Sequence, residues 1–535
     1  MGSYLRDLRA LYNKYEYKSV LYGHFGQGCV HCRVTFELMS APGIRKWRSF
    51  MEEATELCVR HGGSLSGEHG DGQVRAEFLH KMFGDQLIEA FREFKSIWDP
   101  DWKMNPGKIV DPYRIDENLR LGAGYKPWEP ETHFKYPDDK GSFAHAALRC
   151  VGVGKCRRKD AEKADDDTMC PSFMVTHEER HTTRGRAHHL WEMLNGNVLA
   201  DGWHDENVKE SLDLCLACKG CKGDCPVNVD IATYKAEFLS HYWEGRMRPR
   251  HAYAFGLIDQ WARVASLWPG LVNLVTQTPG LSHAAKMVAG MPLRRSIPEF
   301  APQTFCSWFN KRKRHSSYAG RGKVILWPDT FNNYFFPETA QAATEVLENA
   351  GFQVQVPHKH LCCGRPLYDY GMLDTAKLYL GKILHTLRPQ IEAGIPLVVL
   401  EPSCASVFRD ELHSLFPDDP LANKLRKQTL LLSEFLEREA DHAELPRIAR
   451  KALVQGHCHH KSVLRFDAEN SVMKKMGLES DVLASGCCGM AGSFGFESDK
   501  YDISMEIGER KLLPAVRRAP LSTLIMADGF SCREQ

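Results

Sequence analysis

The sequence predicts a multidomain chain of mixed α+β and α/β class, and three observations support this prediction. From Lys323 onwards, short apolar runs alternate with amphipathic helical patterns, which is typical of parallel α/β structure. Before that point, cysteines gather in two groups within a mostly helical stretch. A polar, proline-rich stretch from Tyr125 to Gly141 has the composition of a linker and sets these regions apart from an N-terminal α+β segment.

The expected elements follow this division. In the N-terminal segment we expect a strand at Ser19–Tyr22 and helices at Met51–His61 and Asp85–Trp98. In the last region we expect buried strands at Val324–Trp327, Gln353–Val356, Pro396–Leu400, Ala452–Gln455 and Thr523–Met526, with helices such as Glu338–Ala350 and Leu373–Ile391. The expected domains are an α+β segment (1–120), a linker (121–141), a mainly helical cysteine module (142–250), a helical connector (251–320) and a duplicated α/β region (321–535, with copies 321–440 and 450–535).

Composition narrows the classes of function. The 535 residues carry a formal net charge of +1, so nothing points to nucleic acid as a partner. No apolar run reaches transmembrane length, because Trp268-Pro269-Gly270 interrupts the one around Val264–Val275. The 18 cysteines fall in CxxC steps and CC pairs, which is typical of metal binding in a reducing cytoplasm. We therefore expect a cytoplasmic protein, with peripheral attachment at the inner face of the membrane as an alternative.

A dense cysteine motif identifies the middle of the chain. Cys215, Cys218, Cys221 and Cys225-Pro226 have the spacing C-x2-C-x2-C-x3-C-P, which binds iron–sulfur cubanes. In two-cluster ferredoxins the cysteine before the proline ligates the other cluster. The alternative is a zinc knuckle, although zinc sites rarely use this spacing.

An upstream half-motif supplies the partner cysteines. This half-motif consists of Cys150, Cys156 and Cys170-Pro171, and Val153 stands where a middle cysteine would be expected. A charged insert at residues 157–168 lengthens the interval before Cys170. If the ligands cross over, the first cluster takes Cys215, Cys218, Cys221 and Cys170, and the second takes only Cys150, Cys156 and Cys225. The second site is then a 3Fe–4S cluster, a 4Fe–4S cubane with a non-cysteine ligand, or a 4Fe–4S cluster with one open iron.

The α/β region is duplicated in its cysteines. Cys362-Cys363-Gly364 parallels Cys487-Cys488-Gly489, and Cys404 and Cys532 follow these pairs after 41 and 44 residues. Cys458 precedes the second pair, whereas the matching place in the first copy, near Asp329, has no cysteine. Paired sulfurs on one turn favour metal bridging or redox chemistry, so we expect a redox or cluster role for Cys458, Cys487, Cys488 and Cys532, and for Cys362, Cys363 and Cys404. We expect the isolated Cys58 and Cys306 to be packing residues.

Histidines in the N-terminal segment predict a second kind of site. A glycine-rich turn between His24 and His31 lets both imidazoles converge, and Glu68-His69 lies between glycines. Two imidazoles and a carboxylate are sufficient to hold a divalent metal with open positions. His69 is then available as a base, since its unperturbed pKa lies near neutral pH. The alternative is that these histidines only make hydrogen bonds within loops.

The N-terminal segment resembles the C-terminal part of the FAD-linked oxidases of D-2-hydroxy acids. The family motif G-H-x-G-D-G-N-x-H matches Gly23–His31, with Gln27 and Cys29 as departures, and G-E-H-G matches Gly67–Gly70. Asp99-Pro100 and the run from Asn105 to Lys108 are similar to the closing signature of the family. The resemblance implies that His24, His31 and Glu68 bind a metal, often zinc, and that His69 takes the hydroxyl proton while hydride passes to FAD. Arg33 would bind a substrate carboxylate, which hints at a dicarboxylate, or is a solvated surface arginine.

Residues 321–535 resemble the cysteine-rich CCG domain of heterodisulfide reductases and of the glycolate oxidase iron–sulfur subunit. Together the resemblances imply a dehydrogenase that oxidises D-2-hydroxyglutarate, D-lactate or glycolate with FAD. It would pass electrons through 4Fe–4S clusters to a quinone or an electron carrier protein. No flavin fingerprint is found, so we expect a fragment clipped at both ends, or a partner of a separate FAD-binding half or subunit. The alternatives are a stand-alone electron-transfer subunit and a heterodisulfide-reductase-like thiol enzyme, and a homo-oligomer is compatible with the sequence.

Overall fold

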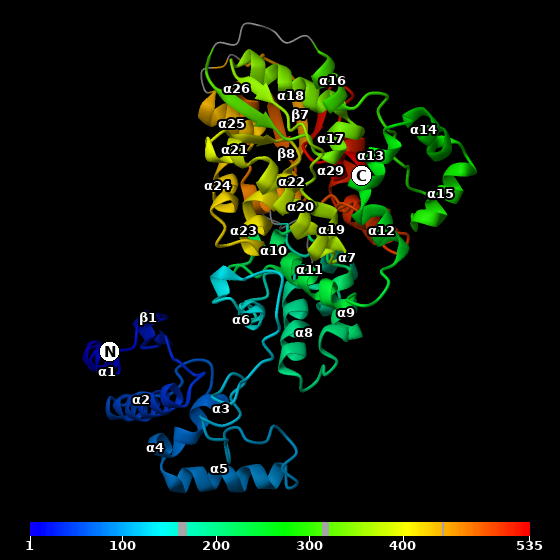
Figure 1. Ribbon diagram of the computed structural model, residues 1–535. Coiled ribbons are helices and arrows are strands. Elements are labelled where there is room, and N and C mark those ends of the chain that lie inside the picture. Colours follow the sequence, from blue (N-terminus) through cyan, green and yellow to red (C-terminus); the bar gives the residue numbers. More distant parts are fainter. Residues whose placement is uncertain (159–167, 313–319, 441–442, 444) are drawn as a thin grey trace. The chain divides into compact units, whose positions relative to one another are not determined.

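The chain forms two compact units, Met1–Lys126 and Pro127–Gln535 (Figure 1). The computed structural model describes residues 1–158, 168–312, 320–440, 443 and 445–535. Most of the charged insert at 157–168 therefore lies outside the described residues.

The first unit packs a small hairpin against two helices. The strands β1 (Ser19–Tyr22) and β2 (His31–Val34) are antiparallel, and α1 (Gly2–Lys14) packs on α2 (Ala41–Arg60). Leu8, Leu11, Tyr12, Phe50 and Leu57 form the buried core. The expected helix at Met51–His61 begins ten residues earlier, at Ala41, because Ser40 caps the amide of Gly43 and Pro42 fits the first turn. The remaining helices are α3 (Gly72–Arg75), α4 (Leu79–Phe83) and α5 (Asp85–Trp98).

The second unit begins with a helical region around the cysteine motifs. In this region, α8 (Thr183–Asn195) starts after the Thr182 cap and is followed by Gly196, whose positive φ of 70° is favourable for glycine because it has no Cβ. Nearly every side chain of α11 is buried, so this helix is the centre of the region. Its helices are α6 (Phe143–Leu148), α7 (Pro171–Thr176), α8 (Thr183–Asn195), α9 (Glu206–Asp213), α10 (Gly220–Asp224) and α11 (Ile231–Tyr242).

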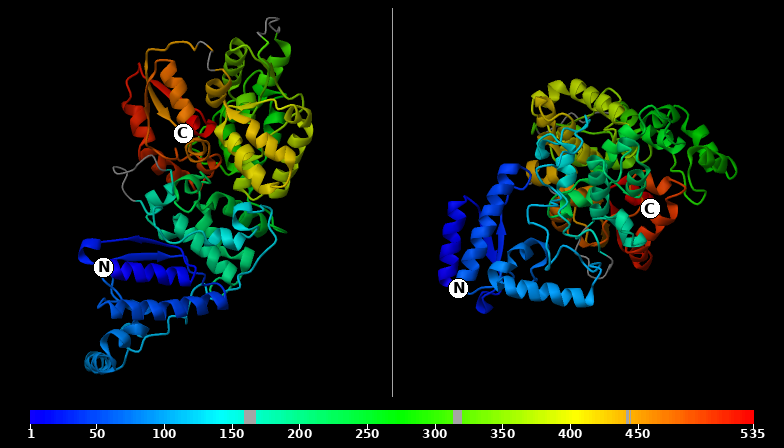
Figure 2. Two further views of the ribbon diagram at one scale, coloured as in Figure 1. Left: turned by 90° about the vertical axis from the view of Figure 1, so that its left-hand side faces the viewer. Right: turned by 90° about the horizontal axis from the view of Figure 1, so that it is seen from below.

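A helical connector follows and leads to the α/β region. In Figure 1 and in the right-hand view of Figure 2, its green helices α14 and α15 stand out from the rest of the unit. The connector helices are α12 (Arg250–Gly256), α13 (Ile258–Ala265), α14 (Pro269–Gln277), α15 (Leu281–Ala289) and α16 (Phe305–Lys311).

Two parallel sheets make up the α/β region. The first has the order β4-β3-β5-β6 and the second β8-β7-β9, so each copy places its first strand between its second and third. This shared order repeats the duplication seen in the cysteines. The strands are β3 (Lys323–Leu326), β4 (Gln353–Gln355), β5 (Leu397–Val399), β6 (Thr429–Leu431), β7 (Lys451–Gln455), β8 (Glu479–Val482) and β9 (Leu524–Ala527).

Helices surround both sheets. The expected helix Leu373–Ile391 is divided in two at Leu387, just before Pro389, whose ring fixes φ and lacks an amide hydrogen. The helices of the first copy are α17 (Thr330–Tyr334), α18 (Pro337–Asn349), α19 (Arg365–Asp369), α20 (Leu373–Thr386), α21 (Arg388–Glu392), α22 (Pro402–Ser406), α23 (Leu412–Leu415), α24 (Pro420–Gln428) and α25 (Leu432–Glu439). Those of the second copy are α26 (Asp467–Lys475), α27 (Tyr501–Glu509), α28 (Leu512–Arg518) and α29 (Phe530–Glu534).

Candidate metal and redox sites

Glu68 is the centre of a histidine cluster in the first unit. Its Oε2 lies 2.8 Å from Nε2 of His31 and 3.5 Å from Nε2 of His69, and its Oε1 lies 3.6 Å from Nε2 of His24. The hydrogen bond from His31, with the charges of the other imidazoles, lowers the pKa of Glu68. The four predicted residues therefore lie together, although they come from two separate loops.

The hairpin turn explains this convergence. Gly23 has a φ of 135°, and a Cβ there would lie 2.8 Å from the carbonyl oxygen of Cys29. The close approach lets the chain turn back into β2, which begins at His31, where the imidazole stacks on Tyr22 at 4.9 Å between ring centroids. Side chains alternate along a strand, so exposed Arg33 shares the face of His31.

Cys29 joins the cluster, which sequence reasoning did not predict. Its Sγ lies 3.9 Å from Oε2 of Glu68, and Cys29, His31 and Glu68 form a potential three-ligand metal group. In the sequence, Cys29 stands out only as a departure from the family motif. The available signal was its two-residue spacing from His31, which favours two ligands on one side of an extended chain.

Four cysteines of the second unit line one small cavity. Cys170, Cys215, Cys218 and Cys221 surround it, and these are the sulfurs that the crossover arrangement groups together. Cys170 is held in the left-handed region, with a φ of 57°, and its Sγ accepts a hydrogen bond from the amide of Thr183 at 2.9 Å. The sulfurs converge as an iron–sulfur cluster requires.

The other three cysteines lie beside this group. The thiol of Cys150 interacts electrostatically with those of Cys156 and Cys225, while Val153 is 61% exposed and offers no ligand. Cys156 also contacts Cys170, whose hydrogen bond lowers the pKa of Cys156 to about 6. The two predicted ligand sets therefore adjoin each other through Cys156 and Cys170.

A buried cation supports the cysteine loop, which is the run from Cys215 to Cys225. Lys219 is 1% exposed, and its Nζ lies 3.0 Å from Asp230, 2.8 Å from Asp410 and 3.2 Å from Glu411. Burial lowers the pKa of Lys219, but the three carboxylates outweigh it and raise the pKa well above its usual value. Since Asp410 and Glu411 belong to the first α/β copy, this ion network ties the cysteine loop to that copy.

The cysteines of the α/β region lie at the carboxyl ends of its parallel strands, where ligands bind in open α/β sheets. In the second copy, Cys487 contacts both Cys458 and Cys488, and Cys488 contacts Cys532. The hydrogen bond from Cys487 outweighs desolvation and, together with the neighbouring His457, lowers the pKa of Cys458 to about 7. Cys458 and Cys487 also pack with Leu216 and Cys218 of the cysteine loop. The four cysteines of the second copy, which we call the second-copy quartet, therefore lie beside that loop.

The first copy brings together three cysteines and an aspartate. Sγ of Cys363 lies 2.8 Å from Sγ of Cys404, and Cys362 contacts Cys363. Asp329 follows β3 as Cys458 follows β7, three residues after the last residue of the strand. Burial and the nearby Glu401 raise the pKa of Asp329 to about 6. The first copy thus has a carboxylate where the second has a thiol.

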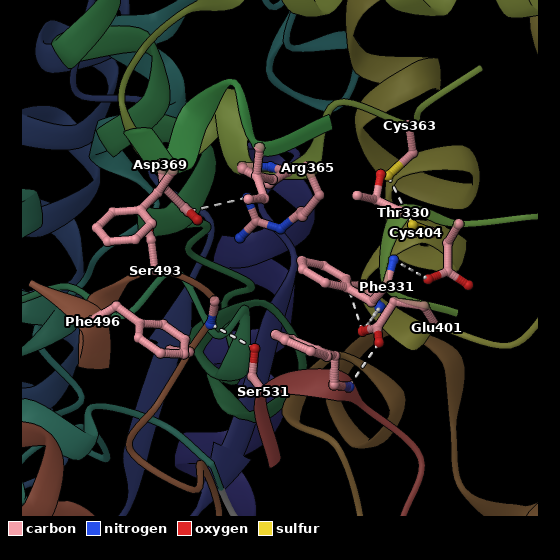
Figure 3. A pocket seen from close by; sticks show the side chains of 18 of the residues that line it. Thr330, Phe331, Cys363, Arg365, Asp369, Glu401, Cys404, Ser493, Phe496 and Ser531 are labelled. Atoms are coloured by element: carbon pink, nitrogen blue, oxygen red, sulfur yellow. Dashed lines mark hydrogen bonds and ion pairs between the residues drawn. The ribbon is translucent and has the colours of Figure 1, made fainter. Parts of the chain in front are cut away.

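A cavity of about 170 Å³ lies between the two copies (Figure 3). Glu401 of the first copy accepts a hydrogen bond from the amide of Phe530 in the second, at 2.9 Å. Arg365 and His459 both donate to the carbonyl oxygen of Ala217 in the cysteine loop, at 3.1 and 2.9 Å. The remaining wall is largely apolar and includes the connector residues Phe255, Ile258, Met291, Ile297 and Phe300.

A second potential metal group in the described residues contains His133, Glu237 and His241. The carboxylate of Glu237 already accepts hydrogen bonds from the amides of His133 and Phe134 at 2.8 and 2.9 Å, and lies 2.8 Å from Nε2 of His241. These contacts anchor residues 133–134 to α11, so a structural role explains the group.

Comparison with known proteins identifies three domains. The family of FAD linked oxidases, C-terminal domain, matches residues 1–109, the 4Fe-4S dicluster domain matches 146–229, and the cysteine-rich CCG domain matches 330–409. Three separate segments of this chain are thus similar to a FAD-linked oxidase C-terminal domain, a 4Fe-4S dicluster domain and a cysteine-rich domain. The expected combination of FAD-linked and iron–sulfur modules is confirmed, and the four cysteines that line one cavity are suited to hold one cluster. The match to the cysteine-rich domain covers the first copy, which has three cysteines.

Relatives that match over most of this chain are named as dehydrogenases or as an oxidase subunit. The chain is 25% identical to the D-2-hydroxyglutarate dehydrogenase of Pantoea ananatis and 26% identical to that of Pseudomonas putida, over 100% of the chain and 55% and 56% of those proteins. It is 24% identical to the glycolate oxidase iron-sulfur subunit of Escherichia coli, over 69% of the chain and 85% of that protein. The chain thus spans about half the length of the dehydrogenases that it matches. No solved structure matches it, and none of its described helices could cross a membrane.

Proposed function

We propose that this chain is part of a flavin-dependent dehydrogenase that oxidises a D-2-hydroxy acid to the 2-oxo acid. The observation that carries the proposal is the convergence of three imidazoles on Glu68 within a FAD-linked oxidase domain. The same chain carries the cysteine groups needed to remove electrons from a flavin one at a time.

The residues of the first unit have separate roles in this proposal. His24, His31 and Glu68 would hold a divalent metal, preferentially zinc. Of these, His31 and Glu68 form the compact group together with Cys29, and His24 lies 3.6 Å from the Glu68 carboxylate. The metal would orient the hydroxyl and carboxylate of the substrate. His69 would take the hydroxyl proton, since it lies beside the group without being needed as a ligand. When bound, FAD supplies the hydride acceptor.

Two observations favour a particular substrate: the position of Arg33 and the names of the relatives. Arg33 extends from the strand that carries His31, and a guanidinium can bind a second carboxylate bidentately. Two relatives at full coverage of this chain are named D-2-hydroxyglutarate dehydrogenases. D-2-hydroxyglutarate, a dicarboxylate, is therefore the proposed substrate ahead of D-lactate.

Electrons would leave through the cysteine groups in turn. The first 4Fe–4S cluster would use Cys170, Cys215, Cys218 and Cys221, and the second, with three cysteines, would be a 3Fe–4S or an incompletely cysteine-ligated 4Fe–4S cluster. The second-copy quartet would receive electrons next, because Cys218 packs against Cys458.

The proposed partners are the FAD-binding half or subunit and an electron acceptor. The acceptor would be a quinone or a carrier protein, with the cavity between the two copies as its place of reduction. A cytoplasmic location with peripheral attachment at the inner face of the membrane would suit a quinone.

A second candidate is a stand-alone electron-transfer subunit. It is favoured by the likeness to the glycolate oxidase iron-sulfur subunit, which covers 69% of this chain. In that case the histidine cluster would bind metal without turning over a substrate.

Dye reduction by the chain combined with its FAD-binding portion separates these candidates. We expect activity with D-2-hydroxyglutarate, and a loss of roughly a hundredfold to ten-thousandfold in kcat for His69→Ala, because general-base catalysis is removed. The matched control is His80→Ala, an exposed histidine on α4 outside the cluster. Full activity in His69→Ala would contradict the role of His69 as the general base. No activity of the unaltered chain with any hydroxy acid would favour the stand-alone electron-transfer subunit.

Iron and sulfide analysis with EPR tests the cluster assignment. About eight irons in anaerobically purified protein fit two cubanes, and about seven fit one cubane with one three-iron cluster. More than about eight irons would place metal in the α/β region as well, whereas zinc without iron would overturn the iron–sulfur assignment.

A further inference from the structure

The connector carries a large exposed apolar surface. Helices α13, α14 and α15, with the turn that follows, present side chains that are each more than a third exposed. Folded monomers rarely expose apolar patches of this extent without an interaction partner. We call this surface the connector patch; it consists of Trp261, Val264, Leu267, Trp268, Leu271, Leu274, Val275, Leu281, Met287, Val288 and Leu293.

The patch belongs to helices that contribute little to the core. No side chain of α14 is buried, and Leu271 and Leu274 are 62% and 59% exposed. α14 packs mainly on α15, in which Ser282 and Lys286 are the buried residues. The pair stands out from the unit in two views (Figures 1 and 2). The apolar face is therefore presented outwards and does not stabilise the sheets.

Charge around the patch favours an anionic partner. From Val264 to Leu293 the sequence contains no Asp or Glu. Exposed arginines flank it at Arg250, Arg263 and Arg294, although Arg294 also pairs with Asp502 at 3.0 Å. Short amphipathic helices with leucine and tryptophan on one side and basic residues beside them are typical of segments that lie in the interface of a bilayer.

The chain segment that carries the patch also contributes residues to the cavity between the two α/β copies. Ile258 of α13 lines that cavity, and so do Met291 and Ile297, which follow α15. The same segment therefore forms both the exposed apolar face and the apolar wall of the cavity. A lipid-soluble acceptor held in a membrane would meet the cavity at this segment.

We propose that the connector patch docks on the surface of a lipid bilayer that contains anionic headgroups. α14 and α15 lie in the interface with Leu271, Leu274 and Trp268 buried among acyl chains, and the flanking arginines contact headgroups. The inference extends the electron-acceptor end of the proposed function, but bilayer binding itself does not require hydroxy-acid oxidation.

Vesicle co-sedimentation tests the proposal on the whole chain. We expect the protein to pellet with vesicles of phosphatidylcholine and phosphatidylglycerol in a ratio of about 3:1, because anionic headgroups attract basic residues near the surface. The double variant Leu271→Asp/Leu274→Asp should lose at least about tenfold in partitioning, since two apolar side chains no longer enter the bilayer. Both residues are exposed, so folding should be retained, as circular dichroism would verify.

The matched control is Leu378→Asp, which changes a leucine that is 72% exposed on α20. It should pellet like the unaltered chain. Failure of the unaltered chain to pellet would overturn the proposal, and so would equal pelleting of the double variant. A dimer that the double variant dissociates, without vesicle binding, would assign the patch to a second copy instead. If the unaltered chain binds vesicles but shows no dye reduction with its FAD-binding portion, the result would count against the proposed function and not against bilayer docking.

Discussion

At the scale of single residues, Glu68 holds the candidate substrate site together. Its carboxylate lies within 2.8 to 3.6 Å of three imidazoles. The glycine-rich turn predicts that His24 and His31 approach each other, whereas their grouping with Glu68 and His69 is what the resemblance to the FAD-linked oxidases implies. The contribution of Cys29 could not be predicted, since it depends on how closely the turn at Gly23 approaches Glu68 in space.

Replacing Glu68 should therefore weaken metal binding first. For Glu68→Gln we expect zinc affinity to fall by at least about tenfold, because a neutral amide is a poor zinc ligand and no longer orients the imidazoles. Competition with a chromophoric chelator measures this without flavin or substrate. Glu56→Gln, an exposed glutamate on α2, is the control and should bind zinc normally. Unchanged zinc affinity in Glu68→Gln would show that Glu68 is not a zinc ligand, and no zinc binding by the unaltered chain would assign the cluster to hydrogen bonding alone.

At the scale of elements, the strands show what sequence patterns can predict. Apolar runs such as Val324–Trp327 predict β3 because a parallel strand is buried on both faces. β8 (Glu479–Val482) was not predicted, since its sequence is mostly polar and it lies at the edge of its sheet. β6 (Thr429–Leu431) was not predicted either, because one threonine and two leucines between two helices, with no turn residue, resemble a continuing helix.

The cysteine loop and the first α/β copy are joined by Lys219, and its removal should be costly. Lys219→Met leaves Asp230, Asp410 and Glu411 without their central cation, so we expect a loss of about 3–5 kcal/mol in the free energy of unfolding. Denaturant titration measures it, with the exposed Lys474→Met on α26 as the control. A loss no larger than that of the control would show that the network contributes nothing.

The same network predicts a pH dependence. Burial raises the pKa of Asp230 and of Asp410, but Lys219 and Lys222 outweigh it, and both values lie below normal. A carboxyl whose pKa is depressed by folding stabilises the fold above its unfolded pKa, about 3.9, and loses this as pH falls through the folded pKa. The stability difference between the unaltered chain and Lys219→Met should thus be complete near neutral pH and shrink below about pH 4. A difference that stays constant down to pH 2 would contradict this.

At the scale of the whole second unit, the cysteine groups are arranged so that one leads to the next. Cys156 contacts Cys170, Cys218 packs with Cys458, and Cys487 joins Cys458 to Cys488. Motif spacing predicts each group, but it carries no information on their order in space. That order depends on the cysteine loop lying between the two α/β copies, where Arg365 and His459 hold the carbonyl oxygen of Ala217.

This arrangement makes Cys458 the link between the iron–sulfur domain and the second copy. In the chain combined with its FAD-binding portion, Cys458→Ser should leave dye reduction intact, because a soluble dye can take electrons directly from the flavin. Turnover with a quinone should fall by at least about tenfold, since electrons then have to pass the altered group. The control Cys306→Ser removes an isolated cysteine outside all the cysteine groups and should change neither rate. Equal losses with dye and quinone would mean that Cys458 supports the fold, and unchanged quinone turnover would mean that electrons leave before they reach the second copy.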